Sequence, residues 1–226
     1  YMTESDEKKY TIGIIGGTGK EGKGLAYRWA KAGHQVLIGS RQAAKALAAA
    51  QDVIDLLGGS EIVKGVENEQ AAVQCDIVVL TVPFSVHVEM CEYLRPFVHG
   101  KVFVDVTVPL VPPKVTRVQM PPEGSAAQQA QALLGDEVKV VAAFQNIAYE
   151  HLLNDEEVAC DVLVCGSKDA REKVIGLVAD AGLVGWSGGL IENSVVVEGL
   201  TSVLIGLNKQ FGVQDAGIRI TGLPRP

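Results

Sequence analysis

No cysteine or histidine pattern in this chain is typical of a metal or redox site. The four cysteines and four histidines do not follow the short C-x-x-C or H-x-x-x-H spacings of such sites. We therefore expect no bound metal, and we interpret the cysteines as reduced, mostly buried thiols of a cytoplasmic protein. The histidines have no evident serine or aspartate partner, so we expect them at the surface or at helix ends and not in catalysis. These residues are Cys75, Cys91, Cys160 and Cys165, and His34, His87, His99 and His151.

Long apolar runs, a positive charge balance and hydrolase motifs are also absent. The net charge is −7 at pH 7, which argues against a nucleic-acid partner. The longest apolar stretch, around residues 195–207, is interrupted by Glu198 and is shorter than the roughly 20 residues that cross a bilayer. The patterns G-x-S-x-G, H-E-x-x-H and Walker A do not occur. We therefore expect small molecules as partners, with neither nucleic acid nor membrane.

The clearest feature that is present is a glycine-rich turn near the start of the chain. An apolar run, Thr11–Ile15, is followed by Gly17, Gly19 and Gly22 in the spacing G-x-G-x-x-G, and a helix-compatible segment comes next. The first glycine permits a tight turn, the second lets the backbone approach a pyrophosphate, and the third lets the helix pack closely on the strand. The pattern predicts a dinucleotide site at the positive end of the helix, where free N–H groups face the phosphates. A plain structural turn is the alternative.

The next apolar run, Gln35–Gly39, ends without the acidic residue that binds the ribose 2′-hydroxyl of NAD. Ser40 and Arg41 stand there instead, and Lys45 follows one helical turn later. Because a hydroxyl and two cations suit a 2′-phosphate, this strand end favours NADP over NAD. The alternative is a solvated arginine and lysine at the start of a helix.

Strand-like runs alternate with helix-like segments up to about residue 187, which predicts an α/β fold. We expect a Rossmann-like, doubly wound parallel sheet, with a further short strand or loop at 182–187. Ligands of such sheets bind beyond the carboxyl ends of the strands, so the loops after residues 82, 106 and 142 should lie at the cofactor edge. The strands are expected near residues 11–15, 35–39, 61–66, 76–82, 101–106, 138–142 and 161–165.

The last part of the chain has a different pattern. Apolar residues recur at helical spacing from Val196 to Phe211, which predicts a helix with a broad apolar face. We expect this helix to complete a second-ligand site and to pair two subunits in a homodimer, because so wide an apolar face needs a partner surface. The chain thus divides into a disordered tail (1–9), an NADP-binding Rossmann-like domain (10–187) and a C-terminal helical portion (188–226).

Several of these segments, taken together and in order, resemble the NADPH-dependent reductases of coenzyme F420, a deazaflavin. The resemblance extends from Tyr10 to near residue 219, and it implies direct hydride transfer between NADP(H) and F420. The segments that carry it are Gly16-Gly-Thr-Gly19, Gly39-Ser-Arg41, Thr81-Val-Pro83, Val108-Pro-Leu-Val-Pro112, Phe144-Gln-Asn146 and Asp161-Val-Leu-Val-Cys-Gly166.

The resemblance also implies which residues hold the two cofactors. Those around the pyrophosphate are Thr18, Gly19, Lys20 and Glu21, together with the turn glycines Gly17 and Gly22. Those at the 2′-phosphate are Ser40, Arg41 and Lys45. Those along the NADP are Val82, Pro83, Phe84, Val88, Val111 and Tyr149. Those beside the deazaflavin ring are Gln145, Asn146, Ile147 and Ala216.

The sequence indicates a cofactor-binding site and no evident general acid or base, so we expect no catalytic side chain in the hydride step. Hydroxyacid and imine reductases of a similar plan carry Lys or Asp on a C-terminal helix, where this chain has Glu192-Asn193-Ser194. Two other functions remain open. One is a non-catalytic NADP-sensing module, and the other is an NADPH-dependent flavin or imine reductase on the same scaffold.

Overall fold

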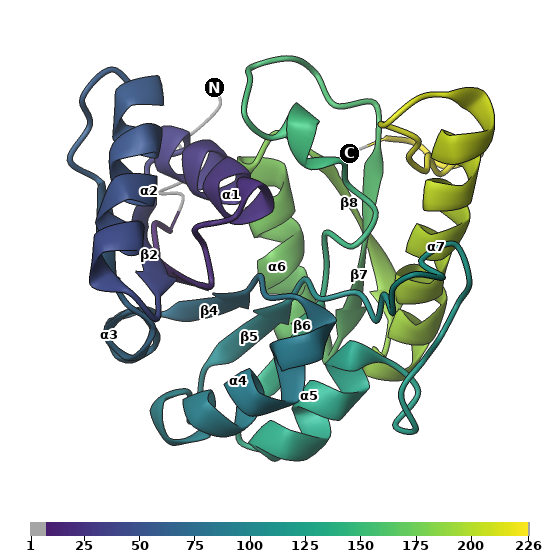
Figure 1. Cartoon of the computed structure of the whole chain (residues 1–226), viewed down its shortest axis with the longest axis horizontal. Helices are drawn as coiled ribbons and strands as arrows, with labels where there is room; N and C mark the ends of the chain where they lie inside the picture. The colour runs from purple at the N-terminus through teal and green to yellow at the C-terminus, as the bar shows by residue number, and fades with distance from the viewer. Residues whose placement is uncertain (1–7, 226) are drawn as a thin grey trace.

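Eight strands form one sheet in a computed structural model of the chain, which describes residues 8–225. The strands are β1 (Thr11–Ile15), β2 (Gln35–Ser40), β3 (Val63–Glu67), β4 (Ile77–Leu80), β5 (Val102–Asp105), β6 (Lys139–Ala142), β7 (Asp161–Gly166) and β8 (Val184–Gly189). Their order is β3-β2-β1-β4-β5-β6-β7-β8 (Figure 1). The first six strands are parallel in the order of the Rossmann fold, which confirms the expected class. Of the predicted tail 1–9, residues 1–7 lie outside the described part.

Helices cover both faces of the sheet. The α-helices are α1 (Lys20–Lys31), α2 (Ala43–Leu56), α3 (Asn68–Gln74), α4 (His87–Leu94), α5 (Ala126–Leu134), α6 (Lys168–Asp180) and α7 (Ser194–Phe211). Four 3₁₀ turns are η1 (Phe84–Val86), η2 (Arg95–Phe97), η3 (Tyr149–His151) and η4 (Ile191–Asn193). Buried side chains of α1, α2 and α6 share one apolar core, and those of α3, α4, α5 and α7 share the other. Because both faces of each central strand are buried, the strands read as continuous apolar runs.

β7 runs antiparallel to β6, whereas the sequence indicated a parallel sheet throughout. The connection explains the difference, because residues 143–160 contain only η3 and no helix that crosses the sheet. The chain therefore enters β7 at the carboxyl end of β6, and β7 runs in the opposite direction. The segment left open as a strand or a loop is strand β8, which pairs in parallel with β7.

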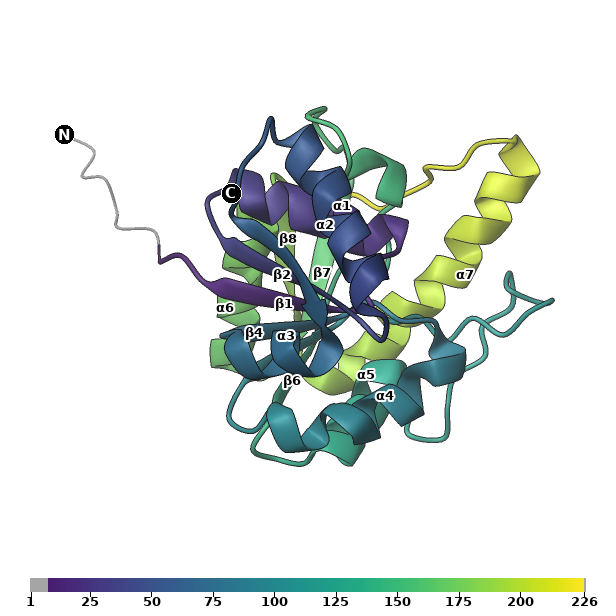
Figure 2. The same ribbon diagram turned by 60° about the vertical axis from the view of Figure 1, so that its left-hand side comes forward.

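α7 carries the chain back to the cofactor edge. Its first turns pack on α5, and Figure 2 shows its far half standing out from the sheet. The helix ends at Gly212, whose φ of 68° reverses the chain into a tail of residues 213–225. Within residues 8–225, no helix is long and apolar enough to cross a membrane. The domain boundary at residue 188 stays a prediction.

Candidate cofactor site

The turn between β1 and α1 has the geometry that the glycine pattern predicts. Gly16 has a φ of 69°, and the N–H of Gly17 donates to the carbonyl of Gly39 at 3.1 Å, which ties the turn to β2. A Cβ on Gly22 would lie 2.6 Å from the Cα of Gly17, so α1 can approach the turn this closely only because residue 22 is glycine. A Cβ on Gly19, by contrast, would meet no described atom within 4 Å. The second glycine of the pattern therefore faces open space.

That open space lies at the uncapped start of α1. Gly19 is the N-cap, and no side chain from the described part of the chain caps it. The N–H groups of the first turn and the positive end of the helix dipole are thus available to an anion, which is how pyrophosphates bind such turns. Glu21 is half-buried in the same turn, and burial raises the pKa of its carboxyl to about 8.

Asn68 supports the turn, and sequence reasoning did not single it out. Its side chain is buried, and its Oδ1 accepts a hydrogen bond from the N–H of Gly16 at 3.2 Å. Asn68 follows β3 directly, so its position as a polar residue at a strand end was the available signal.

The predicted 2′-phosphate residues come together at a cavity of about 210 Å³ beside this turn. Ser40, Arg41 and Lys45 all line it, together with Asn68. Arg41 and Lys45 are exposed, and neither has a hydrogen-bond or ion-pair partner within residues 8–225. Two unpaired cations and a hydroxyl are suited to a phosphate monoester.

A second, larger cavity of about 1180 Å³ extends from the same turn, past the ends of β4, β5 and β6, to α7 and the tail. Most of the predicted cofactor residues line it. These are Thr18, Gly19, Glu21, Val82, Pro83, Phe84, Gln145, Asn146, Ile147, Tyr149 and Ala216.

The remaining predicted residues lie outside the lining of both cavities. Gly17 and Gly22 form the turn itself. Lys20 lies at the mouth, where its Nζ donates to the hydroxyl of Tyr149 at 3.1 Å. Val88 and Val111 are each about 40% exposed on neighbouring segments, and the structure does not bring them into the cavity wall.

Gln145 and Asn146 present carbonyl oxygens that have no hydrogen-bond partner in the described chain. Their amide NH₂ groups are used by the fold, since Gln145 donates to the backbone carbonyl of Asp105 at 2.8 Å and Asn146 to that of Val197 at 3.0 Å. Phe144, just before them, has a φ of 72°, which lets its ring pack on Trp29 in the core. A buried acceptor without a donor costs about 1–3 kcal/mol. Both residues line the cavity, although neither oxygen is itself exposed to it.

One face of α7 completes the cavity, and sequence reasoning missed these positions. Thr201, Leu204, Ile205, Asn208 and Lys209 recur at helical spacing and line the wall. The signal was present in the pattern, because Thr201, Leu204 and Asn208 share one stripe of the helix. The pattern predicted that this helix completes a second-ligand site, but it did not indicate which of its residues line the wall.

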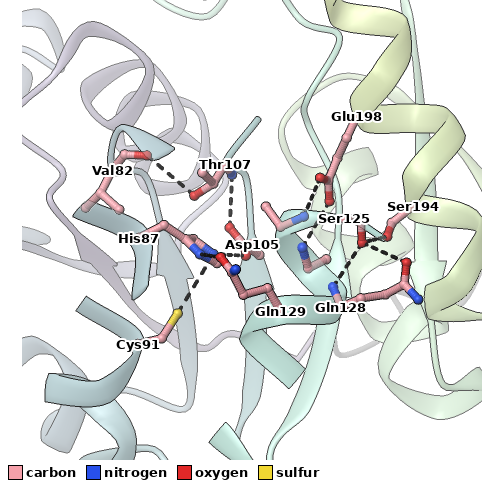
Figure 3. A network of polar contacts seen from close by, with 12 residues as sticks. Val82, His87, Cys91, Asp105, Thr107, Ser125, Gln128, Gln129, Ser194 and Glu198 are labelled. Carbon is pink, nitrogen blue, oxygen red and sulfur yellow. Dashed lines mark hydrogen bonds and ion pairs between the residues drawn. The ribbon is translucent and has the colours of Figure 1, made fainter. Parts of the chain in front are cut away.

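The expectation that the histidines have no aspartate partner is wrong for His87 and His34, and both are buried, although His87 does begin helix α4 as the helix-end alternative allowed. His87 is fully buried, with Nε2 2.7 Å from a carboxylate oxygen of Asp105 and Nδ1 3.1 Å from the side-chain oxygen of Gln129 (Figure 3). Burial alone would lower the pKa of His87, but Asp105, with Cys91 nearby, raises it to about 11. His34 is also buried and contacts Asp180 at 2.9 Å. Both partners are distant in sequence, which is why the pattern did not reveal them.

Asp105 in turn orders the strand end that borders the cavity. Its second oxygen accepts the N–H of Thr107 at 3.0 Å, and the Thr107 hydroxyl donates to the carbonyl of Val82 (Figure 3). The His87–Asp105 pair is therefore a structural support beneath the cofactor edge, and it does not line the cavity.

Glu198 joins α7 to the start of α5. Its carboxylate is buried and accepts the N–H groups of Ala126 and Ala127 at 2.6 and 3.0 Å (Figure 3). Burial, helped by repulsion from Asp105, raises the pKa of Glu198 to about 8. The contact fixes the inner end of α7 and, with it, the cavity wall.

All four cysteines are buried and unpaired, as expected. No group of three or more potential metal ligands occurs among the residues that the structure describes.

An uncapped helix start after a glycine turn, at the edge of a Rossmann sheet, defines a dinucleotide-binding protein. A family model described as "NADP oxidoreductase coenzyme F420-dependent" matches residues 11–109. The F420-dependent NADP reductase of Methanothermobacter thermautotrophicus is 42% identical over 94% of this chain and 95% of that protein. The enzyme of the same name from Methanocaldococcus jannaschii is 39% identical over 94% and 98%. The chain belongs to the family of F420-dependent NADP reductases.

A solved structure supports the fold independently. A protein from Arthrobacter sp. FB24, described as a candidate F420-dependent NADP reductase, superimposes with a TM-score of 0.80 at 23% identity. The match covers 94% of this chain and 99% of that one, so the likeness includes the C-terminal helix.

Proposed function

We propose that this chain is an oxidoreductase that transfers a hydride directly between NADP(H) and the deazaflavin coenzyme F420. The observation that carries the proposal is the continuous cavity of about 1180 Å³ from the pyrophosphate turn to α7. Pockets for one small molecule usually measure about 300–1,000 Å³, so this cavity has room for two ring systems.

The NADP half of the site is formed by the first part of the chain. The N–H groups at Gly19 bind the pyrophosphate, and Ser40, Arg41 and Lys45 hold the 2′-phosphate. Val82 and Pro83 offer apolar surface at the end of β4, where a nicotinamide would lie.

The deazaflavin half is formed by the loop after β6, by α7 and by the tail. Gln145 and Asn146 line this half and would hold the polar edge of the ring system, and N–H groups that reached their buried oxygens would remove the cost of leaving them unpaired. Ile147 and Leu204 are apolar and exclude water from the gap between the rings. When bound, the two cofactors supply the hydride chemistry themselves, and the protein positions them.

We further propose that the chain acts as a homodimer in the cytoplasm. The outer face of α7 exposes Val196, Val203 and Phe211, each at least half exposed, which supports pairing with a second copy. The four unpaired thiols suit a reducing compartment.

Mixing the protein with NADPH and oxidised F420 tests the proposed reaction. We expect the absorbance of the oxidised deazaflavin to disappear as an equal amount of NADPH is consumed, with NADH as a much slower control. NADPH labelled with deuterium at the reactive carbon should pass the label to the deazaflavin and not to water. NADPH binding without any turnover would instead indicate an NADP-sensing module. Preferred reduction of a flavin or a cyclic imine would indicate the other alternative.

A further inference from the structure

Asp161 is a buried carboxylate that the cofactor site does not use. It is the first residue of β7, it is fully buried, and it does not line either cavity. Its Oδ2 accepts hydrogen bonds from the indole N–H of Trp186 and the backbone N–H of Ile220, each at 2.8 Å. Its Oδ1 accepts one from Arg225, also at 2.8 Å. Two of these three donors belong to the C-terminal tail.

The backbone of Asp161 holds the same tail. Its N–H donates to the carbonyl of Ile218 at 2.8 Å. Asp161 thus forms hydrogen bonds with residues 218, 220 and 225 of the tail. Burial would raise the pKa of Asp161, but the donors from Ile220, Trp186 and Arg225 outweigh it, and the pKa lies below the ordinary value. The side chain is therefore ionised at neutral pH, which makes each contact charge-assisted.

The tail reaches Asp161 only after it has passed the cavity. Figure 1 shows the chain reversing at the far end of α7 and returning toward β7 and β8. On the way, Val213, Gln214 and Ala216 line the cavity. The N–H of Ala216 donates to the side chain of Asn208 at 2.9 Å.

Gly217, the next residue of the tail, packs closely against Cys160. A Cβ on Gly217 would lie 2.6 Å from the sulfur of Cys160, so the tail is pressed against the residue before Asp161. The wall segment 213–216 therefore connects α7 on one side to the Asp161 contacts on the other, and within it Asp215 also contacts His151, whose Nε2 lies 3.7 Å from its carboxylate. Within residues 8–225, the carboxylate of Asp161 is the only side-chain acceptor that residues of the tail beyond 217 contact.

We propose that Asp161 is a positioning residue for the second ligand: it anchors the C-terminal tail and thereby fixes the cavity wall at residues 213–216. The proposal rests on the proposed function in taking that ligand to be F420. The two halves of the site can be tested separately, because the cavity at the 2′-phosphate residues is lined by residues between Gly16 and Met90 and by none of the tail.

Two substitutions test the anchor in the full chain. Asp161→Asn removes the charge, and Arg225→Ala removes one exposed donor without disturbing the sheet. A released tail must be reordered each time F420 binds. The apparent dissociation constant for F420 then equals the intrinsic constant divided by the fraction of chains whose tail is anchored. We expect the KM for F420 to rise by about tenfold or more in both variants, with kcat and the Kd for NADPH changed by less than about twofold. Arg225→Lys should restore part of the affinity.

The matched control is Arg219→Ala, which removes an exposed arginine of the same tail that has no partner within the described residues. It should leave the KM for F420 unchanged. Hydrogen exchange of the ligand-free protein gives a second readout, because the Ile220 N–H should exchange faster in Asp161→Asn and Arg225→Ala but not in the control.

The outcomes separate the anchor from the proposed function. If the KM for F420 and the Kd for NADPH shift together, the residue is structural only and the proposal is overturned. Faster exchange of the Ile220 N–H with an unchanged KM for F420 in these variants would also overturn the proposal. So would an exchange rate that matches the wild type. A wild-type chain that does not turn over F420 would refute the proposed function, while the exchange measurement would still decide whether Asp161 holds the tail.

Discussion

At the scale of single residues, we propose that the cavity beside β2 discriminates between cofactors by charge. Arg41 and Lys45 are exposed cations without partners in residues 8–225, so their charges are available to a ligand. NAD lacks the 2′-phosphate that would neutralise them. Preference for NADP therefore depends on a few side chains at one strand end and not on the sheet as a whole.

Arg41→Ala should weaken NADPH binding and leave NADH binding almost unchanged. Losing a charge-assisted contact to phosphate costs about 1.5–3 kcal/mol, roughly ten- to a hundredfold in affinity. Titrations of both cofactors by fluorescence would measure the two Kd values. Arg95→Ala, an exposed arginine outside both cavities, is the control. Equal losses for NADPH and NADH would contradict a role at the 2′-phosphate.

A test for a proton donor must avoid the buried pair His87 and Asp105. Removing one partner leaves an uncompensated buried charge, which costs about 3–5 kcal/mol of stability and would obscure any kinetic effect. The residue to test is Lys209, which the structure adds to the cavity wall.

Lys209→Met should reduce the single-turnover rate of hydride transfer by less than about tenfold, because the hydride moves between carbon centres of the cofactors. General acids and bases typically contribute about 10²–10⁴-fold. His151→Ala and Glu192→Ala should have equally small effects, and both residues lie outside the cavity lining. A hundredfold loss at Lys209, with both ligands still bound at saturation, would identify it as a proton donor.

At the scale of elements, the position of α7 depends on its own residue Glu198, whose carboxylate binds the first N–H groups of α5. The pKa of Glu198 in the folded protein is raised to about 8, from 4.5. A raised pKa means that the contribution to stability is complete below pH 4.5 and is lost as the pH rises through 8. The free energy of unfolding should therefore fall across the neutral range, because ionising the buried carboxyl costs more than its two N–H donors return.

Glu198→Gln should remove this part of the pH dependence. The amide cannot release a proton, so the free energy of unfolding should fall less between pH 5 and pH 8 in the variant than in the wild type. The variant should also be less stable at pH 5 by about 1–3 kcal/mol, because one of the two backbone N–H groups loses its acceptor. Urea unfolding at several pH values would measure both effects, with the exposed Glu192→Gln as control. Identical slopes in variant and wild type would refute the assignment.

Elements whose signals are local could be predicted from the sequence. The glycine turn and α7 both appear where their patterns indicated. The direction of β7 could not be predicted, because it depends on whether the preceding loop crosses the sheet. The pairing of His87 with Asp105 and the role of Asn68 also escaped prediction, since both depend on strand ends that meet only in the folded sheet.

At the scale of the whole molecule, α7 has two faces with different roles. Its inner face lines the cavity through Thr201, Leu204 and Asn208. Its outer face carries an apolar stripe at intervals of seven, four and four residues. This stripe consists of Val196, Val203, Leu207 and Phe211, which are 68, 50, 39 and 67% exposed. A single straight stripe can pair with its own copy about a two-fold axis, which buries the same residues on both subunits.

Leu207→Lys should therefore convert a homodimer into a monomer. Leu207 lies within the stripe, and a buried lysine opposite its own copy would place two unpaired positive charges in an apolar contact. Light scattering at micromolar concentration would give the mass. Leu47→Lys is the control, because Leu47 is an equally apolar residue, 60% exposed, on α2. The control should keep the dimer mass. NADPH should still bind to the Leu207→Lys variant, because its site is built from β1, β2 and β4. If the wild-type chain already has the mass of a monomer, the apolar stripe does not pair two subunits.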